Sequence, residues 1–324
     1  MSIKNDSALA YRIARYYYLD NLSQSEIAQI EQISRSTVSR MLDKARASGM
    51  VTIDIKMPVS PLIDKLESSL QEALGLTRVI VVPASVNELN ETTDETVVQD
   101  LASIAATHMT ELLKDCKIIG LGWGRTVYST VGYMPFVEPD SSRLFIPLVS
   151  NYSVRNRFLQ TSTIVSRYGE RFGAQTYYLN ISGVKRPEEQ RTESEILNIR
   201  QLERYWSEMD AAVLSLGAPL KGKNPYHSEL AIYSAEGDDE QSERGEMLSQ
   251  LYFSNGETCW MGRDAEIVAF PLSKLKDVKN VICIAGGLDK AKPILYASKN
   301  GYFKTLITDH LTATEMLDAL AKMK

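Results

Sequence analysis

From residue 76 onward, the chain alternates short apolar runs with longer segments that carry apolar residues at helical spacing. The runs that we expect to form strands are 78–82, 117–121, 143–149, 175–179, 211–216, 266–270, 280–285 and 304–308. Helical spacing predicts helices over 96–114, 161–172, 193–206, 291–299 and 312–323. This alternation is typical of an α/β fold, in which helices cover both faces of a mainly parallel sheet. Ligands in such sheets bind beyond the carboxyl ends of the strands, so the loops there are the first candidates for a site.

Three of the predicted strands, 117–121, 211–216 and 280–285, lead into loops that contain glycine. The residues of interest in these loops are Gly122, Gly124, Arg125, Thr126, Gly217, Gly286, Gly287 and Lys290. Glycine lets backbone N–H groups come close to an anion, and a helix that follows adds the partial positive charge of its N-terminus. We therefore predict that these loops converge on a phosphate group. For each loop taken alone, the alternative is an ordinary strand–helix turn in which glycine permits tight packing.

The first of these loops does not fit a dinucleotide site. It reads G-x-G-x-G in place of G-x-G-x-x-G, and Glu138 and Asp140 precede the predicted strand 143–149 instead of ending it. The three histidines are scattered, and the three cysteines sit singly in apolar settings without metal-ligand spacing. We therefore expect no catalytic base beside the glycine loops, no metal ion and no cofactor.

The first sixty residues predict a helix-turn-helix. After a first helix that ends before LDNLS, Ser23 and Glu26 form a capping box for a short helix over 24–31. Ser34 can cap a second short helix, which ends in the usual manner before Gly49. We expect these helices to bury Ala8, Tyr11, Ile13, Ala14, Tyr17, Tyr18, Ile27, Ala28, Ile30, Val38, Met41, Leu42 and Ala45. The last helix of such a motif enters the major groove of DNA.

The remaining face of that last helix carries side chains that suit DNA. Arginine pairs with guanine or phosphate, and hydroxyl groups with bases or phosphate. The candidate DNA-binding residues are Gln24, Ser34, Arg35, Ser36, Thr37, Ser39, Arg40 and Lys44. Gln32 occupies the turn position where glycine often eases a left-handed conformation, at a cost of about 1 kcal/mol. The alternative is a helical hairpin that serves as an oligomerisation arm.

Charge and composition support a two-part chain. Residues 1–57 hold eight basic and six acidic residues, whereas the whole chain has a net charge of −5. Alternation over 51–56 predicts a strand that forms a wing behind the helices, and Pro58 and Pro61 then bracket a hinge. Leucines recur every fourth position from 62 to 74, in a helix that connects the parts or pairs with a second subunit. Without a signal peptide or a bilayer-spanning run, we expect a cytoplasmic protein that contacts no membrane.

Larger segments of the chain also form a recognisable set. IARYYYLDNLSQSEIAQIEQISRSTVSRMLDKARASGMVTIDI, IIGLGWGRTV, WSEMDAAVLSLGAP, VICIAGGLDKAKPILYA and GYFKTLITD follow one another along nearly the whole chain. They resemble the SorC family of sugar-responsive bacterial transcriptional regulators, and among these the sorbose- and sorbitol-type regulators. The resemblance implies a winged helix-turn-helix, a Rossmann-like domain related to sugar-phosphate isomerases, a phosphorylated sugar as effector, and a homodimer or homotetramer on operator DNA.

The resemblance also assigns effector-binding residues. It points to the glycine-loop residues named above and adds Gln160 and Asn255. Asn255 stands where an aspartate is common, and VSNYSVRNRFLQ brings Arg155 and Arg157 to a loop that is rich in glycine in many relatives. Both departures affect which sugar the pocket would take.

Taken together, the sequence predicts a helix-turn-helix domain (1–57), a linker and connecting helix (58–75) and an effector-binding and oligomerisation domain (76–324). The predicted function is regulation of a carbohydrate-utilisation operon through operator DNA, under the control of a phosphorylated sugar. The alternatives are a sugar-phosphate isomerase or deaminase with a DNA-binding head, and an interaction module whose loops bind nothing. The expected lack of a base beside the glycine loops favours the regulator.

Overall fold

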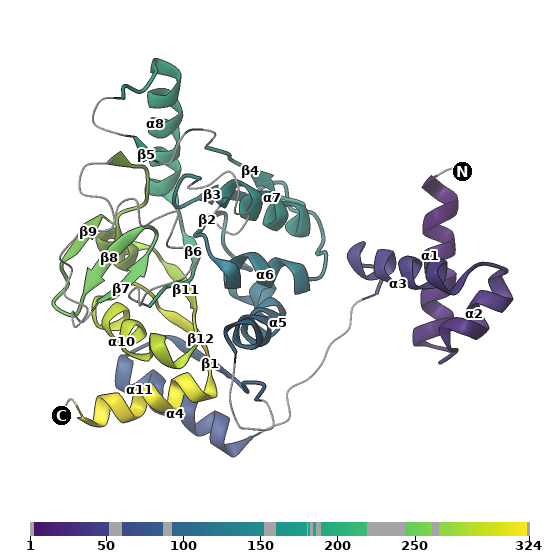
Figure 1. The fold of residues 1–324 in the computed structure, drawn as a ribbon. Helices are drawn as coiled ribbons and strands as arrows, with labels where there is room; N and C mark the ends of the chain where they lie inside the picture. Colours follow the sequence, from purple (N-terminus) through teal and green to yellow (C-terminus); the bar gives the residue numbers. More distant parts are fainter. Residues whose placement is uncertain are drawn as a thin grey trace. The chain divides into compact units, whose positions relative to one another are not determined.

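The computed structural model describes residues 3–51, 60–86, 93–151, 160–179, 181, 184–185, 189–218, 244–260 and 266–322 (Figure 1). The chain forms two compact units, Met1–Pro58 and Val59–Lys324. The expected wing over 51–56, the hinge at Pro58 and the two arginines at 155 and 157 lie wholly or largely outside the described residues.

The first unit is a three-helix domain that contains the predicted helix-turn-helix. Its helices are α1 (Ile3–Tyr18), α2 (Gln24–Glu31) and α3 (Arg35–Ala47). The capping box of Ser23 and Glu26 is present, and Ser34 caps α3 by accepting a hydrogen bond from the N–H of Thr37 at 3.1 Å. Gln32 has φ 52° and ψ 45°, the left-handed conformation predicted for the turn. The core of the unit consists of Ala10, Ile13, Ala14, Ile27, Val38, Met41, Leu42 and Ala45.

Part of the expected core of this unit is wrong. Tyr11 is 59% exposed, Tyr17 37% and Ile30 52%, and Ala8 is exposed as well. In a domain of three short helices, only one narrow row of each helix reaches the interior. On α1 that row is Ala10, Ile13 and Ala14, so Tyr11 and Tyr17 face outward, whereas Tyr16 and Tyr18 pack partly buried against the core.

The second unit is built on a parallel sheet, as predicted, and this sheet has seven strands. The strand order is β1-β12-β11-β6-β2-β3-β4, and every neighbouring pair is parallel. The strands are β1 (Arg78–Val82), β2 (Ile118–Leu121), β3 (Leu144–Pro147), β4 (Gln175–Thr176), β6 (Ala211–Leu214), β11 (Asn280–Ile284) and β12 (Thr305–Asp309). Except in the short edge strand β4, which is polar and not buried, their apolar sequences are buried on both faces, which explains why they lack polar alternation.

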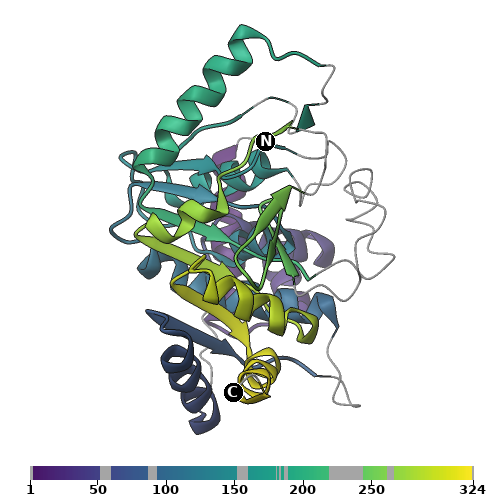
Figure 2. The same cartoon turned by 90° about the vertical axis from the view of Figure 1, so that its left-hand side faces the viewer.

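Helices cover both faces of this sheet (Figures 1 and 2). On one face lie α5 (Asp94–Leu112), α6 (Arg125–Tyr133) and α7 (Thr161–Phe172). On the other lie α4 (Pro61–Leu74), α8 (Glu193–Glu208), α10 (Ala291–Lys299) and α11 (His310–Lys322). The chain crosses the sheet in one direction from β1 through β2 and β3 to β4, and in the other direction from β6 through β11 to β12. Because crossovers between parallel strands are right-handed, the helices of these two series lie on opposite faces.

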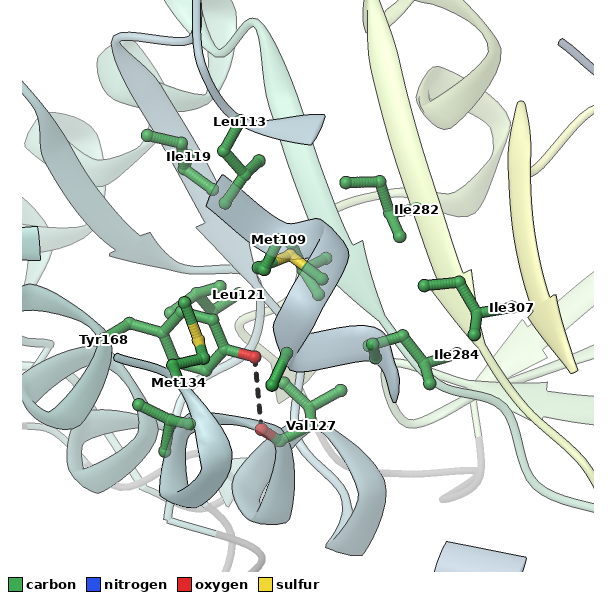
Figure 3. Close-up of a cluster of buried hydrophobic side chains, with 14 of the residues drawn as sticks. Met109, Leu113, Ile119, Leu121, Val127, Met134, Tyr168, Ile282, Ile284 and Ile307 are labelled. Atoms are coloured by element: carbon green, nitrogen blue, oxygen red, sulfur yellow. Dashed lines mark hydrogen bonds between the residues drawn. The ribbon is translucent and has the colours of Figure 1, made fainter. Parts of the chain in front are cut away.

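The main core lies between the sheet and α5, α6 and α7 (Figure 3). Met109 and Leu113 of α5 pack there with Ile119 and Leu121 of β2. The fully buried Tyr168 adds a polar contact, because its hydroxyl donates a hydrogen bond to the carbonyl oxygen of Val127 at 3.3 Å. This hydrogen bond ties α7 to the first turn of α6.

The helix expected as a connector packs within the second unit. Ile63, Leu66 and Leu70 of α4 are buried, and the helix contacts β1 and α11. Leu62, the first leucine of the series, is 57% exposed. The leucine series therefore covers the edge of this sheet, and pairing of α4 with a second subunit stays a prediction.

Two small antiparallel sheets accompany the main sheet. One contains β7 (Arg244–Met247), β8 (Gln250–Phe253) and β9 (Thr258–Trp260), which the sequence did not predict. The other pairs β5 (Val184–Lys185) with β10 (Glu266–Ile267). The prediction that 266–270 forms a strand of the parallel sheet is therefore wrong. Its apolar residues are buried because the segment runs antiparallel past the end of β3, where Ser150 N–H donates to Val268 O at 2.9 Å.

None of the helices in the described ranges combines the length and the hydropathy that crossing a lipid bilayer requires.

Candidate functional site

The strand order reverses between β2 and β6, which lie side by side in the middle of the sheet. The chain leaves β2 toward β3 on one side, and it continues from β6 toward β11 on the other. A crevice at such a switch point is where α/β sheets bind ligands. The loops after β2, β6 and β11 are the three glycine loops predicted from the sequence, and they follow adjacent strands.

The three glycines of the β2 loop have different roles. At Gly120 a Cβ atom would overlap with Leu148 and Met209, so this glycine serves packing within the sheet. Gly122 donates its N–H to Val213 O at 2.9 Å, and Leu248 lies 3.0 Å from where its Cβ would be. Gly124 has φ 137° and directly precedes α6. Gly124, the N-cap residue, has no side chain that could cap α6, and the polar N-terminus of this helix lies at the switch point.

The loops at this edge carry two cations. Burial lowers the pKa of Lys290, and the nearby charge of Arg125 lowers it further, while Asp289 and Asp94 act in the opposite direction. Arg125 Nη2 lies 3.4 Å from Asp94 Oδ2 at the start of α5. The cations of the β2 and β11 loops are thus near enough for the charge of Arg125 to act on Lys290. Thr126 is buried in the first turn of α6.

The β11 loop holds one of the protein's own carboxylates. Gly287 N–H donates to Asp309 Oδ2 at 3.0 Å and to Thr312 Oγ1 at 2.8 Å. At Gly286 a Cβ atom would overlap with the same Asp309 carboxylate. The glycines of this loop therefore surround an acid of the fold, and the amide of Gly287 is already bonded.

The β6 loop lies against Glu246, an acid that the sequence did not assign to the site. Gly217 and Glu246 exchange backbone hydrogen bonds of 2.9 and 3.1 Å, and a Cβ atom on Gly217 would lie 3.2 Å from Glu246 Oε2. Burial raises the pKa of Glu246 to about 7, although its Oε1 accepts a 2.7 Å hydrogen bond from Ser249 N–H. The expectation that no base lies beside the glycine loops is therefore wrong.

The turn between β7 and β8 brings Glu246 to this position. Leu248 and Ser249 have φ of 52° and 64°, the turn type that suits a two-residue hairpin. Leu248 covers Gly122, so the hairpin tip lies at the switch point. Neither Leu248 nor Ser249 is a residue type that normally indicates such a turn. The acid between Gly245 and Met247 was the one sequence signal for a site here, and the structure shows that it lies in a fully buried strand.

Further polar atoms gather in the loops at this edge. Among buried side-chain atoms without a hydrogen-bond partner in the described ranges are Trp123 Nε1, Ser150 Oγ, Thr161 Oγ1 and Ser249 Oγ. Gln160 directly precedes α7, and its Oε1 accepts a hydrogen bond from Thr163 Oγ1 at 3.2 Å. Gln160 therefore lies at the carboxyl edge, beyond β3.

Asn255 does not join this group. It lies beyond the far end of β8, where its Oδ1 accepts the N–H of Glu257 at 3.0 Å. The neighbouring Phe253 O accepts a 3.0 Å hydrogen bond from Asn300 Nδ2. Asn300 directly follows the last residue of α10, whereas Lys290 directly precedes its first residue. The structure thus places Asn255 at the opposite end of α10, in a turn that its own side chain stabilises.

In the first unit, α3 presents the predicted DNA-binding face. Arg35, Ser36 and Arg40 are exposed, and Ser39 is half-buried. The Ser34 hydroxyl lies 2.8 Å from that of Thr37, within the cap. The other two candidates are half-buried: Gln24 begins α2, and Lys44 forms a 3.4 Å ion pair with Asp6 of α1. Arg35 and Arg40 are therefore open on this face, while Ser34 and Thr37 hold the start of α3.

No group of histidine, cysteine, aspartate and glutamate side chains in the described part of the chain could hold a metal ion.

Comparisons with known proteins agree with this organisation. Residues 62–318 match a family described as "Putative sugar-binding domain". The chain is 26% identical over 324 residues to the sorbitol operon regulator of Klebsiella pneumoniae, covering 98% of this chain and 100% of that protein. It is 25% identical to the deoxyribonucleoside regulator of Bacillus subtilis, covering 96% and 98%. The crystal structure of the full-length sorbitol operon regulator SorC superposes with a TM-score of 0.67 at 25% identity, covering 97% of this chain and 99% of that one.

Proposed function

The chain belongs to the family of SorC-type transcriptional regulators that carry this sugar-binding domain, and from that premise we propose that a phosphorylated sugar controls its binding to operator DNA. The relatives are named as a sorbitol operon regulator and a deoxyribonucleoside regulator, which supports a carbohydrate-utilisation operon as the target. Operator DNA lies in the bacterial cytoplasm, so the proposal includes a cytoplasmic protein.

The observation that carries the proposal is that Arg125 begins α6 and that its charge acts on the buried Lys290 of the β11 loop. An anion between the two cations would offset the repulsion by which Arg125 lowers the pKa of Lys290. The phosphate would also accept hydrogen bonds from the first N–H groups of α6, where helix polarity favours negative charge. Charge-assisted hydrogen bonds of this kind contribute about 1.5–3 kcal/mol each.

The sugar itself would lie toward Glu246 and the hairpin tip. Glu246 can accept hydrogen bonds from hydroxyl groups when charged and donate one when protonated. Trp123 Nε1, Thr161 Oγ1 and Ser249 Oγ are further buried polar atoms with capacity for hydrogen bonds to a ligand. A ligand with several hydroxyl groups fits this set better than an apolar one.

In the DNA-bound state, Arg35 and Arg40 of α3 would contact base edges or phosphates of the major groove. Two copies are needed to contact a symmetric operator, so we propose that the protein acts as a homodimer or homotetramer. Effector binding would change the relative stability of two subunit arrangements that differ in affinity for the operator.

The test is thermal stabilisation of the purified chain by sorbitol 6-phosphate, 2-deoxyribose 5-phosphate and glucose 6-phosphate. The unphosphorylated sugars and inorganic phosphate are the controls. Stabilisation by at least one phosphorylated sugar, with loss in Lys290→Met, supports the proposal. Stabilisation by none, or equally by a free sugar and its phosphate, rules it out.

Glu246 favours one second candidate, a sugar-phosphate isomerase. A carboxyl group with a pKa of about 7 could act as a general base at neutral pH. The relatives are named as regulators, and we propose that the protein is not an enzyme. Conversion of any sugar phosphate of the panel, followed by NMR and abolished in Glu246→Gln, would establish the enzyme instead.

A further inference from the structure

We propose that Asp309 is a positioning residue of the effector site: its carboxylate fixes the β11 loop so that Lys290 is presented beside Arg125. The inference rests on the proposed function in naming Lys290 as a phosphate ligand. It differs from the sequence interpretation, in which the glycines of this loop bind the phosphate themselves.

Asp309 is the last residue of β12 and is 1% exposed. Its two oxygens serve two elements. Oδ1 accepts the N–H of Thr312 at 2.9 Å, which caps the start of α11. Oδ2 accepts the N–H of Gly287 at 3.0 Å and the hydroxyl of Thr312 at 2.6 Å. One buried carboxylate thus joins the start of a helix to the neighbouring glycine loop.

The loop is shaped around this carboxylate. A Cβ atom at Gly286 would overlap with Asp309 Oδ2 and would lie 2.9 Å from Leu101 Cδ1. Gly287 has φ 111°, a conformation that side chains rarely allow, and in it the N–H meets the carboxylate. Both glycines are therefore accounted for by the fold, without a ligand.

The loop leads directly to Lys290. The N–H of Lys290 bonds to Gly287 O at 2.9 Å, closing the single turn of 3₁₀ helix Leu288–Lys290. Fixing Gly287 consequently fixes the start of the turn that ends at Lys290. The division of roles follows: the N-terminus of α6, Arg125 and Lys290 face the phosphate, and the Gly286–Gly287 pair holds Lys290 in place.

Asp309→Asn separates the two roles of the carboxylate. The amide oxygen keeps the cap on α11, but its NH₂ group cannot accept the N–H of Gly287, which keeps only its 2.8 Å hydrogen bond to Thr312 Oγ1. Asp210→Asn is the matched control, because Asp210 also accepts backbone N–H groups, those of Lys117 and Ile118, at the amino ends of the strands. Both variants lose hydrogen bonds to a carboxylate, but only the first changes the Lys290 loop.

Amide hydrogen exchange of the full chain is the readout that needs no ligand. We expect exchange in segment 285–290 to become about tenfold faster in Asp309→Asn, with the first turn of α11 unchanged and no change at 285–290 in Asp210→Asn. Unchanged exchange at 285–290 in Asp309→Asn overturns the proposal, whatever the sugar phosphates do.

The second readout is the affinity for the sugar phosphate that stabilises the chain most in the panel above. Asp309→Asn should weaken binding about tenfold and Asp210→Asn should leave it unchanged. In a Lys290→Met background, Asp309→Asn should cause no further loss, because it acts through Lys290. Equal losses in both aspartate variants, or additive losses with Lys290→Met, overturn the positioning role. A separate outcome is that exchange at 285–290 becomes faster in Asp309→Asn while the wild type binds no sugar phosphate of the panel. In that case Asp309 holds the loop as inferred, and the proposed function is refuted.

Discussion

Raising the pH from about 5 to about 8 should destabilise the second unit through one side chain, Glu246. Burial raises the pKa of this carboxyl from 4.5 to about 7, so the folded chain holds the proton over a range in which the unfolded chain has lost it. The stabilising contribution is full below pH 4.5 and is lost as the pH rises to about 7. Each pH unit in this window corresponds to about 1.4 kcal/mol, which gives a total of about 3 kcal/mol.

Tryptophan fluorescence during urea unfolding measures this effect in the intact chain. All three tryptophans, at 123, 206 and 260, belong to the second unit, so the signal reports its unfolding alone. His108 has a lowered pKa through burial, which makes stability rise with pH in the same window and partly opposes Glu246. The difference in unfolding free energy between the wild type and Glu246→Gln cancels the titration of His108 and of every other group that both chains share. The glutamine keeps the shape of the side chain and the acceptor for Ser249 N–H, but it does not ionise. A free-energy difference between the two chains that is independent of pH from about 5 to about 8 would refute the reasoning.

Three other substitutions test separate parts of the account. Gly120→Ala should lower the stability of the second unit by about 1–3 kcal/mol, measured by tryptophan fluorescence, since its Cβ would overlap with Leu148 and Met209; an unchanged midpoint would show that the sheet has room. Gln32→Gly should stabilise the first unit by about 1 kcal/mol in circular dichroism melting, because φ 52° no longer strains the turn, and a destabilised unit would contradict this. Arg40→Ala should weaken operator binding by about 1–3 kcal/mol in fluorescence anisotropy and leave sugar-phosphate binding intact; unchanged operator affinity would remove Arg40 from the contacts.

The sequence was most informative where local chemistry determines the structure. The cap at Ser23, the left-handed Gln32 and the strand 78–82 were predicted correctly because each depends on neighbours within a few residues. The parallel sheet followed from uninterrupted apolar strands. Ile30 and Tyr11 were assigned to the core wrongly, because periodicity gives the apolar face of a helix but not how much of it the partner covers.

The candidate site was predictable as a set of loops and not as a set of contacts. Gly217 and the glycines at 286 and 287 were identified as anion-binding, yet their neighbours in space are acids from other elements, Glu246 and Asp309. Each acid belongs to another strand and lies more than twenty residues away from the glycine that it contacts. No local sequence pattern therefore connects the acid with the glycine loop. Glu246 also depends on a hairpin whose turn residues, Leu248 and Ser249, carry no turn signal.

The central claim is that a phosphorylated sugar, bound at the carboxyl edge of the sheet, changes the affinity of the protein for its operator. The direct measurement is fluorescence anisotropy of labelled operator DNA, titrated with wild-type protein and with Lys290→Met, each with and without the sugar phosphates of the panel. We expect one sugar phosphate to change the operator affinity of the wild type about tenfold, with no effect of its unphosphorylated form and none on Lys290→Met. An operator affinity that no sugar phosphate changes, or a variant that responds like the wild type, would contradict the account.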